Sequence, residues 1–168
     1  MSVSIYRVSV PVFVKHLKGL ASCLKKTQAL YSEKKYDEVT LLNYRLYPDM
    51  FNFTRQVQYA TTHAVACTAL LAGMEVPKSD DNEKSLAELI ARVEGALAFL
   101  NAIKPEQIEG SEDKSITIKK PDGDQVVKGI DLLLNNRLPN FLFHTTNAYG
   151  IMRHNGVEIG KAHFMGNR

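Results

Sequence analysis

The chain has 168 residues, of which 45% are hydrophobic and 23% are charged. This length supports one sizeable core but not two ordinary domains, so we expect a single domain over residues 1–168. The net charge is +3, but the basic runs are no longer than pairs, and Lys25-Lys26 and Lys119-Lys120 have no aromatic platform around them. Phosphate backbones need a clustered basic surface, so we expect no binding of nucleic acid.

Residues 1–20 contain neither an apolar segment of membrane-spanning length nor a small-residue cleavage site after a short apolar run. We therefore expect no membrane partner and a cytoplasmic location. The two cysteines, Cys23 and Cys67, belong to no motif that binds metal or forms disulfides. Each is expected to be a small buried side chain in a reducing compartment.

Three segments have apolar residues at the spacing of a core-facing helix. The rows are Phe13, Leu17, Leu20 and Leu24, then Phe53, Val57, Ala60, Ala64, Cys67 and Leu71, then Leu86, Leu89 or Ile90, Val93, Leu97 and Leu100. Gly73 is expected to close the second helix, and Ser85 with Glu88 forms a capping-box pattern that opens the third. Pro11 lies early in the first helix, either in its first turn or at a kink.

The pattern changes after the third helix. Residues 115–129 form two short β-branched runs around Pro121-Asp122-Gly123, which predicts a β-hairpin. An isolated hairpin is only marginally stable, so we expect it to lean on the helices as an exposed appendage outside the core. A fourth helical region runs from about Ile130 to His154, is interrupted or started afresh at Pro139, and ends at Asn155-Gly156.

These elements predict a four-helix bundle with a hairpin insert between its third and fourth helices. The motifs "RLYPDMF" (residues 45–51), "RQVQ" (residues 55–58) and "LPNFLFHTTNAYGIMRHNGVEIGK" (residues 138–161) resemble the domain of unknown function family 1993. The resemblance covers nearly the whole chain, from Val10 onward. That family is grouped with the DinB-like bundle proteins, so the resemblance implies an all-α DinB-like fold.

Many DinB-like proteins are thought to be metal-dependent. The resemblance implies a divalent ion, such as zinc or nickel, held by a histidine of the second helix and a His-x-x-x-His pair of the fourth. In this chain the second histidine of the pair is matched by His144, the first by Asn140, and the second-helix ligand by Gln56. Carboxamides are poor ligands for zinc or nickel, so the set predicts a degenerate metal site. His63, on the same flank of its helix as Gln56, is a further candidate ligand beside His144.

The residues leave several roles open. His144 is either a hydrogen-bonded core histidine or a ligand-binding group. Gln56 and Asn140 either bond to each other and to His144 or line a small wet cavity. Arg45 and Asp49 are expected to form an ion pair, with contact to a substrate as the alternative.

Two functions follow. The first is a non-catalytic bundle that binds a small molecule or a protein partner at Gln56, Asn140 and His144 without a tight metal. The alternative, implied by the resemblance, is a metal-dependent enzyme of the thiol transferase or hydrolase type, with His144 as general base or weak metal ligand. A homodimer is also expected, because DinB-like bundles often pair and because Leu142 and Phe143 lie outside the core row of the fourth helix.

Overall fold

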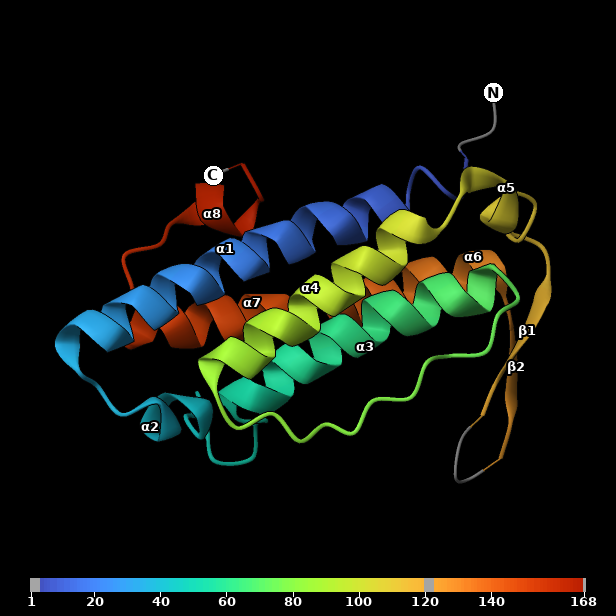
Figure 1. The fold of residues 1–168 in the computed structure, drawn as a ribbon. Coiled ribbons are helices and arrows are strands. Elements are labelled where there is room, and N and C mark those ends of the chain that lie inside the picture. The colour runs from blue at the N-terminus through green and yellow to red at the C-terminus, as the bar shows by residue number, and fades with distance from the viewer. Residues whose placement is uncertain (1–3, 120–122, 168) are drawn as a thin grey trace.

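The structure is a computed structural model that describes residues 4–119 and 123–167. Its main elements are the long helices α1 (Val10–Lys34), α3 (Phe53–Leu71), α4 (Leu86–Ala102) and α7 (Leu138–His154). Shorter elements are α2 (Glu38–Leu42), α5 (Pro105–Ile108), β1 (Ser115–Ile118), β2 (Gln125–Lys128), α6 (Gly129–Asp131), the π-helix η1 (Leu132–Arg137) and α8 (Lys161–Phe164). The expected all-α bundle with a hairpin insert is confirmed (Figure 1).

The long helices do not simply alternate in direction. Helices α3 and α4 run the same way, and α1 and α7 run the opposite way (Figure 1). Residues 72–85 must therefore return along the outside of α3 before α4 begins, as a long crossover connection. This crossover segment, residues 72–85, places polar side chains against α3 and α4.

The helix ends follow the local chemistry of the chain. Pro11 lies in the first turn of α1, where its missing N–H group costs no hydrogen bond. Ser85 caps α4 by accepting from the Glu88 N–H at 3.1 Å, while the Glu88 carboxylate accepts from the Lys84 N–H and leaves the capping box incomplete. Glycines in the left-handed conformation follow α3 and α7, at Gly73 and Gly156, as predicted.

The predicted core rows face one another inside the bundle. Phe13, Phe53 and Phe141 are fully buried, and the Phe13 and Phe141 rings meet edge to face at 5.0 Å. Cys23 and Cys67 are free and buried, as predicted. Within the described residues, no helix has both the length and the apolar character that a membrane crossing requires.

The hairpin forms with Ile116 opposite Val127 and Ile118 opposite Gln125. Its strands are as predicted, while most of the expected turn lies outside the described residues. The expectation that the hairpin stays outside the core is wrong for β1, because Ile116 and Ile118 are buried in the main apolar cluster. One face of β1 packs against the bundle, whereas Val126 on β2 is 63% exposed.

The fourth helical region is one continuous path from α6 through η1 to α7. Pro139 does not break it, because the chain widens into a π-helix just before the proline. The Leu138 N–H reaches back to the Leu133 carbonyl, five residues earlier, instead of four. A proline clashes with the carbonyl four residues before it in an α-helix, so the wider turn accommodates Pro139.

Candidate functional site

Gln56 and His144 form a buried hydrogen bond between α3 and α7. The Gln56 Oε1 and His144 Nδ1 atoms are 2.8 Å apart, and the two residues are 1% and 6% exposed. The Gln56 Nε2 donates to the Phe51 carbonyl at 3.2 Å, which turns Oε1 toward the imidazole. His144 therefore carries its proton on Nδ1 and keeps a lone pair on Nε2.

His63 lies against His144 and carries its proton on the other ring nitrogen, Nε2. The two rings are nearly parallel, with centroids 5.5 Å apart and an angle of 11° between their planes. The Arg137 Nη1 lies 3.3 Å from His63 Nδ1, and a guanidinium can only donate. His63 Nδ1 is therefore the acceptor, and its proton is on Nε2.

Burial keeps both imidazoles neutral. Burial, with the positive charge of Arg137 and the neighbouring His144 as further causes, lowers the pKa of His63 to about 4. Burial also lowers the pKa of His144. At neutral pH the pair offers one ring acceptor and one ring donor without carrying charge.

Aromatic rings surround the two histidines. The Tyr59 ring lies 5.2 Å from His144, and the Phe143 ring meets His144 edge-on at 5.3 Å. Phe51 stacks on Tyr59 at 4.8 Å and is 40% exposed, while Phe143 is 56% exposed. We refer to the histidine cluster as Gln56, His63, Arg137 and His144 together with the rings of Phe51, Tyr59 and Phe143.

Two of the residues singled out in the sequence make other contacts. Asn140 is half-buried, and its Nδ2 donates at 2.7 Å to the Asn136 carbonyl, one turn earlier in the helix. The hydrogen bonds of the described residues thus join Gln56 to His144 but do not include a bond from Asn140 to either. Arg45 donates to the Met50 carbonyl, and the expected ion pair with Asp49 is absent from the described residues.

Arg137 is the member of the cluster that sequence reasoning missed. It lies at the end of the π-helix, seven residues before His144. That spacing of two helical turns is a signal that could have placed it near the histidine. It is one of 21 basic residues, however, and nothing else in the sequence distinguishes it.

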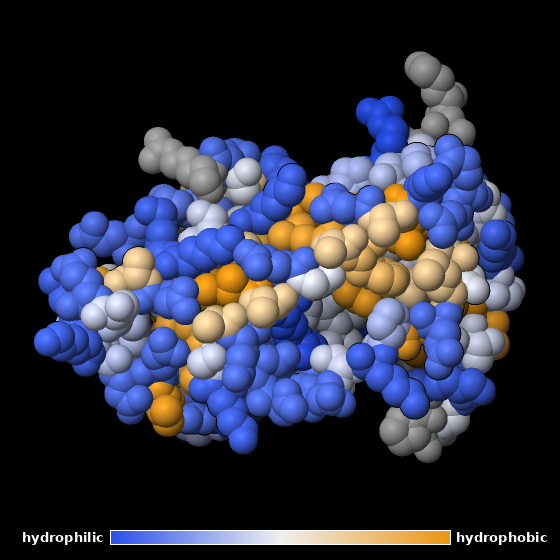
Figure 2. All heavy atoms as spheres, in the orientation of Figure 1, coloured by the Kyte–Doolittle hydropathy of each residue, from blue (hydrophilic) through white to orange (hydrophobic). Residues whose placement is uncertain are grey.

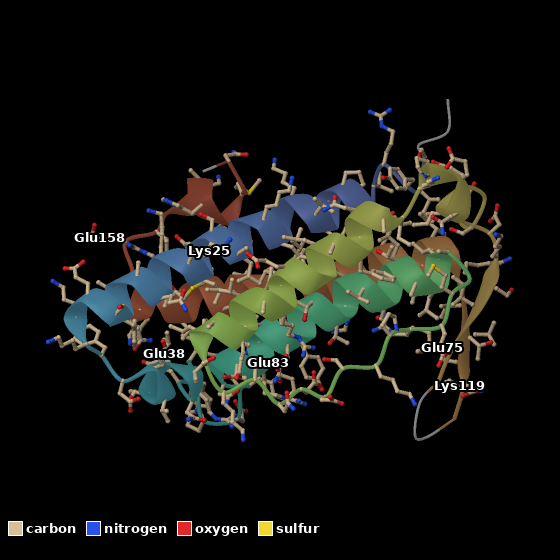
Figure 3. The ribbon with its side chains drawn as sticks, viewed as in Figure 1. Lys25, Glu38, Glu75, Glu83, Lys119 and Glu158 are labelled. Atoms are coloured by element: carbon tan, nitrogen blue, oxygen red, sulfur yellow. The ribbon has the colours of Figure 1, made fainter. Side chains whose placement is uncertain are left out.

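A second polar group surrounds Arg92, whose side chain is 9% exposed. Its guanidinium bonds Thr61 of α3 at 2.7 Å and, in the crossover segment, Asp81 and Glu83 at 2.8 Å each. Glu83 lies where the crossover segment passes α3 (Figure 3). Beside this group, α3, α4 and the crossover segment line an open pocket of about 400 Å³, on the face where Figure 2 shows apolar side chains gathered over α4.

The chain matches the family described as "Domain of unknown function (DUF1993)" over residues 5–165. The chain belongs to this family. A solved structure of a DinB family member protein from Shewanella denitrificans is similar to this DUF1993 chain, with 38% sequence identity and a TM-score of 0.86. The alignment covers 96% of this chain and 92% of that one, and a comparison with curated proteins gives no match.

The DinB-like relationship implies a divalent metal, and the donors in this DUF1993 chain fit one poorly. His63 Nδ1 is bonded to a guanidinium, its Nε2 carries the proton, and Gln56 Oε1 accepts from His144. The lone pair on His144 Nε2 is the ring acceptor that remains in the pair, and the guanidinium of Arg137 adds a positive charge at the neighbouring His63. Among residues 4–119 and 123–167, no three His, Cys, Asp or Glu side chains come together in a way that could hold an ion.

Proposed function

We propose that this DUF1993 protein binds a small molecule at the histidine cluster and holds no tight metal there. The observation that carries the proposal is the pair of opposite tautomers in His63 and His144, each fixed by a neighbouring side chain. Small-molecule sites combine an apolar or aromatic lining with a few fixed polar groups. The cluster has both, because the exposed Phe51 and Phe143 lie against His144, which offers a ring acceptor, and His63 stacked on His144 offers a ring donor.

A second candidate is the enzyme of the thiol transferase or hydrolase type. It is favoured by the bond from His144 Nδ1 to Gln56, because a neutral imidazole held at one nitrogen can act as a base through the other. In the metal-dependent version, zinc or nickel would bind His144 Nε2, with His63 as a second ligand. Cys67 is a poor nucleophile for this role, since burial raises its pKa to about 12.

Thermal-shift and ligand-detected NMR screening of thiols and small metabolites tests the first proposal. A compound that binds at the cluster is expected to perturb the His63 and His144 imidazole signals and to lose affinity in His144→Phe. The exposed His154→Gln is the matched control and is expected to bind as the wild type does. If the bound compound is turned over only when zinc or nickel is added, the enzyme is the correct function.

We also propose that the protein is a homodimer through the outer face of α7. The support is Phe143, which is 56% exposed, together with the half-buried Leu142 beside it. Light scattering at tens of micromolar protein is expected to give twice the chain mass for the wild type and the chain mass for Phe143→Ser. Val126→Ser removes a side chain that is 63% exposed on β2 and should leave the dimer intact. A monomeric wild type contradicts the proposal.

A further inference from the structure

Arg137 is a half-buried cation without an anionic partner. Among the residues that the structure describes, its buried Nε atom has no hydrogen-bond partner, and the one bond of its guanidinium goes to the neutral His63. Within residues 4–119 and 123–167, no carboxylate lies within 4.0 Å of its guanidinium. Arg55 and Arg92, in contrast, are both paired with Asp81.

An unpaired charge in a partly buried place is unfavourable. Removing a guanidinium from water costs free energy unless an anion or several acceptors take the place of the water. Burial lowers the pKa of Arg137, yet an arginine stays protonated at neutral pH. The neutral imidazole of His63 accepts one hydrogen bond but brings no negative charge. The positive charge is therefore not compensated by the side chains around it.

We propose that the histidine cluster binds a small organic oxyanion, a carboxylate or a phosphate, through the Arg137 guanidinium. The inference rests on the proposed small-molecule function and specifies the class of ligand. The planar guanidinium matches two oxygens of such a group, and His63 Nε2–H is a further donor in the same cluster. The Phe51, Tyr59 and Phe143 rings provide apolar surface for the body of the molecule.

The same charge explains why the site prefers an anion to a metal. A divalent cation at His63 would lie beside a fixed positive charge, whereas an oxyanion at the Arg137 guanidinium neutralises that charge. Arg137 is held in this position by the π-turn that precedes Pro139 and by its bond to His63. The π-turn and the unpaired charge of Arg137 therefore lie at the same place in the chain, and π-turns are often found at functional sites.

The test uses the full-length protein with inorganic phosphate and, separately, acetate as probes. Each is titrated while the His63 and His144 imidazole signals are followed by NMR, with sodium chloride at equal ionic strength as the reference. Saturable shifts with at least one oxyanion are expected in the wild type. Arg137→Gln should weaken that binding about tenfold or more, the loss typical of a charge-assisted bond. Arg7→Gln removes an equal charge from an exposed side chain and should bind as the wild type does.

The outcomes separate the two proposals. If chloride gives the same shifts as the oxyanions, or if Arg137→Gln binds as tightly as the wild type, the anion assignment is wrong. If neutral metabolites bind the cluster and neither oxyanion does, the ligand class is wrong and the proposed function stands. If no compound perturbs the histidines, both fail. If Arg137→Gln does not fold, Arg137→Lys replaces it in the test, because lysine keeps the charge but lacks the planar guanidinium. This variant is expected to bind the oxyanion several-fold more weakly than the wild type. Equal binding by the two proteins overturns the proposal.

Discussion

His63 and His144 lie face to face with their ring planes 11° apart, yet their hydrogen bonds fix opposite tautomers. Gln56 accepts from one ring and Arg137 donates to the other. Protonating His63 at Nδ1 would put two donors against each other, and the new charge would face the guanidinium. The two hydrogen bonds therefore require both imidazoles to be neutral, so protonation of His63 should lower the stability of the fold.

The free energy of unfolding is expected to fall as the pH falls from 6.5 toward 4. The pKa of His63 is about 4 in the folded protein and 6.5 as the ordinary value, so the unfolded chain binds the proton first. The contribution of a depressed pKa is present above the unfolded value and is lost as the pH falls toward the folded one. For His63 this amounts to about 3 kcal/mol, and His144 acts in the same direction.

Urea denaturation of the wild type and His63→Gln at a series of pH values between 7 and 4 measures this effect. The glutamine keeps an acceptor for Arg137 but does not titrate, so the loss of stability should be shallower in the variant. The exposed His154→Gln is the control and should follow the wild-type curve. Parallel curves for His63→Gln and the wild type would contradict the assigned pKa.

Much of the fold could be predicted because apolar spacing alone determines it. Val57, Ala64 and Leu71 lie on one row of α3, and all three are buried as that row requires. The hairpin strands could be predicted from their β-branched residues. The burial of Ile118 could not, because it depends on where β1 meets the bundle.

The candidate site was predictable only in part. Gln56 and His144 were picked out through the resemblance, and His63 through its position on the flank of the same helix. The structure brings these three residues together. The position of Arg137 depends on a π-turn that widens the helix before Pro139 and on the register between η1 and α3. The spacing of seven residues relates Arg137 to His144 on one helix, but it does not predict the contact of Arg137 with His63 on α3.

The small α8 helix is expected to depend on Gly19. A Cβ atom at this position of α1 would lie 2.6 Å from the His163 carbonyl oxygen and 2.7 Å from that of Phe164. Gly19→Ala must therefore push α8 away, and we expect a loss of about 1–3 kcal/mol in the free energy of unfolding. Gly95→Ala, on α4 with no atom within 4 Å of the added Cβ, should stabilise by about 0.5–1 kcal/mol. Chemical denaturation measures the free energy of unfolding of both variants. Equal changes in the two would show that Gly19 is not required for the close contact between α1 and α8.

The crossover segment is expected to depend on Arg92. Its guanidinium ties Asp81 and Glu83 to α3 with little exposure to water. Arg92→Met leaves the half-buried Glu83 carboxylate without its cationic partner and with the neutral Gln58 amide as its side-chain donor. The expected loss is about 3–5 kcal/mol in the free energy of unfolding, with faster proteolysis within residues 72–85. Lys25→Met breaks an ion pair with Glu94 that is about half exposed, and should cost less than about 1 kcal/mol. Similar losses in the two variants would show that the Arg92 network does not hold the segment.

Zinc binding should appear when the charge and the amide of the histidine cluster are both replaced. In Gln56→His with Arg137→Gln, the guanidinium beside His63 is gone and an imidazole stands where the amide was. His63, His144 and the new histidine can then converge, which suits zinc.

Isothermal titration of zinc into metal-free protein is expected to show at least about tenfold tighter binding for this double variant than for the wild type, the change that 1.4 kcal/mol of added affinity produces. Asn140→His is the matched control. The Asn140 side chain turns back to the Asn136 carbonyl, so a histidine placed there should leave zinc affinity near that of the wild type. The degenerate-site interpretation is wrong if untagged wild-type protein already carries about one zinc per chain, by elemental analysis, and His144→Ala removes it. If Asn140→His binds zinc as tightly as the double variant, the degenerate-site interpretation stands, but the ligands converge nearer the start of α7 than the contact between His63 and His144 indicates.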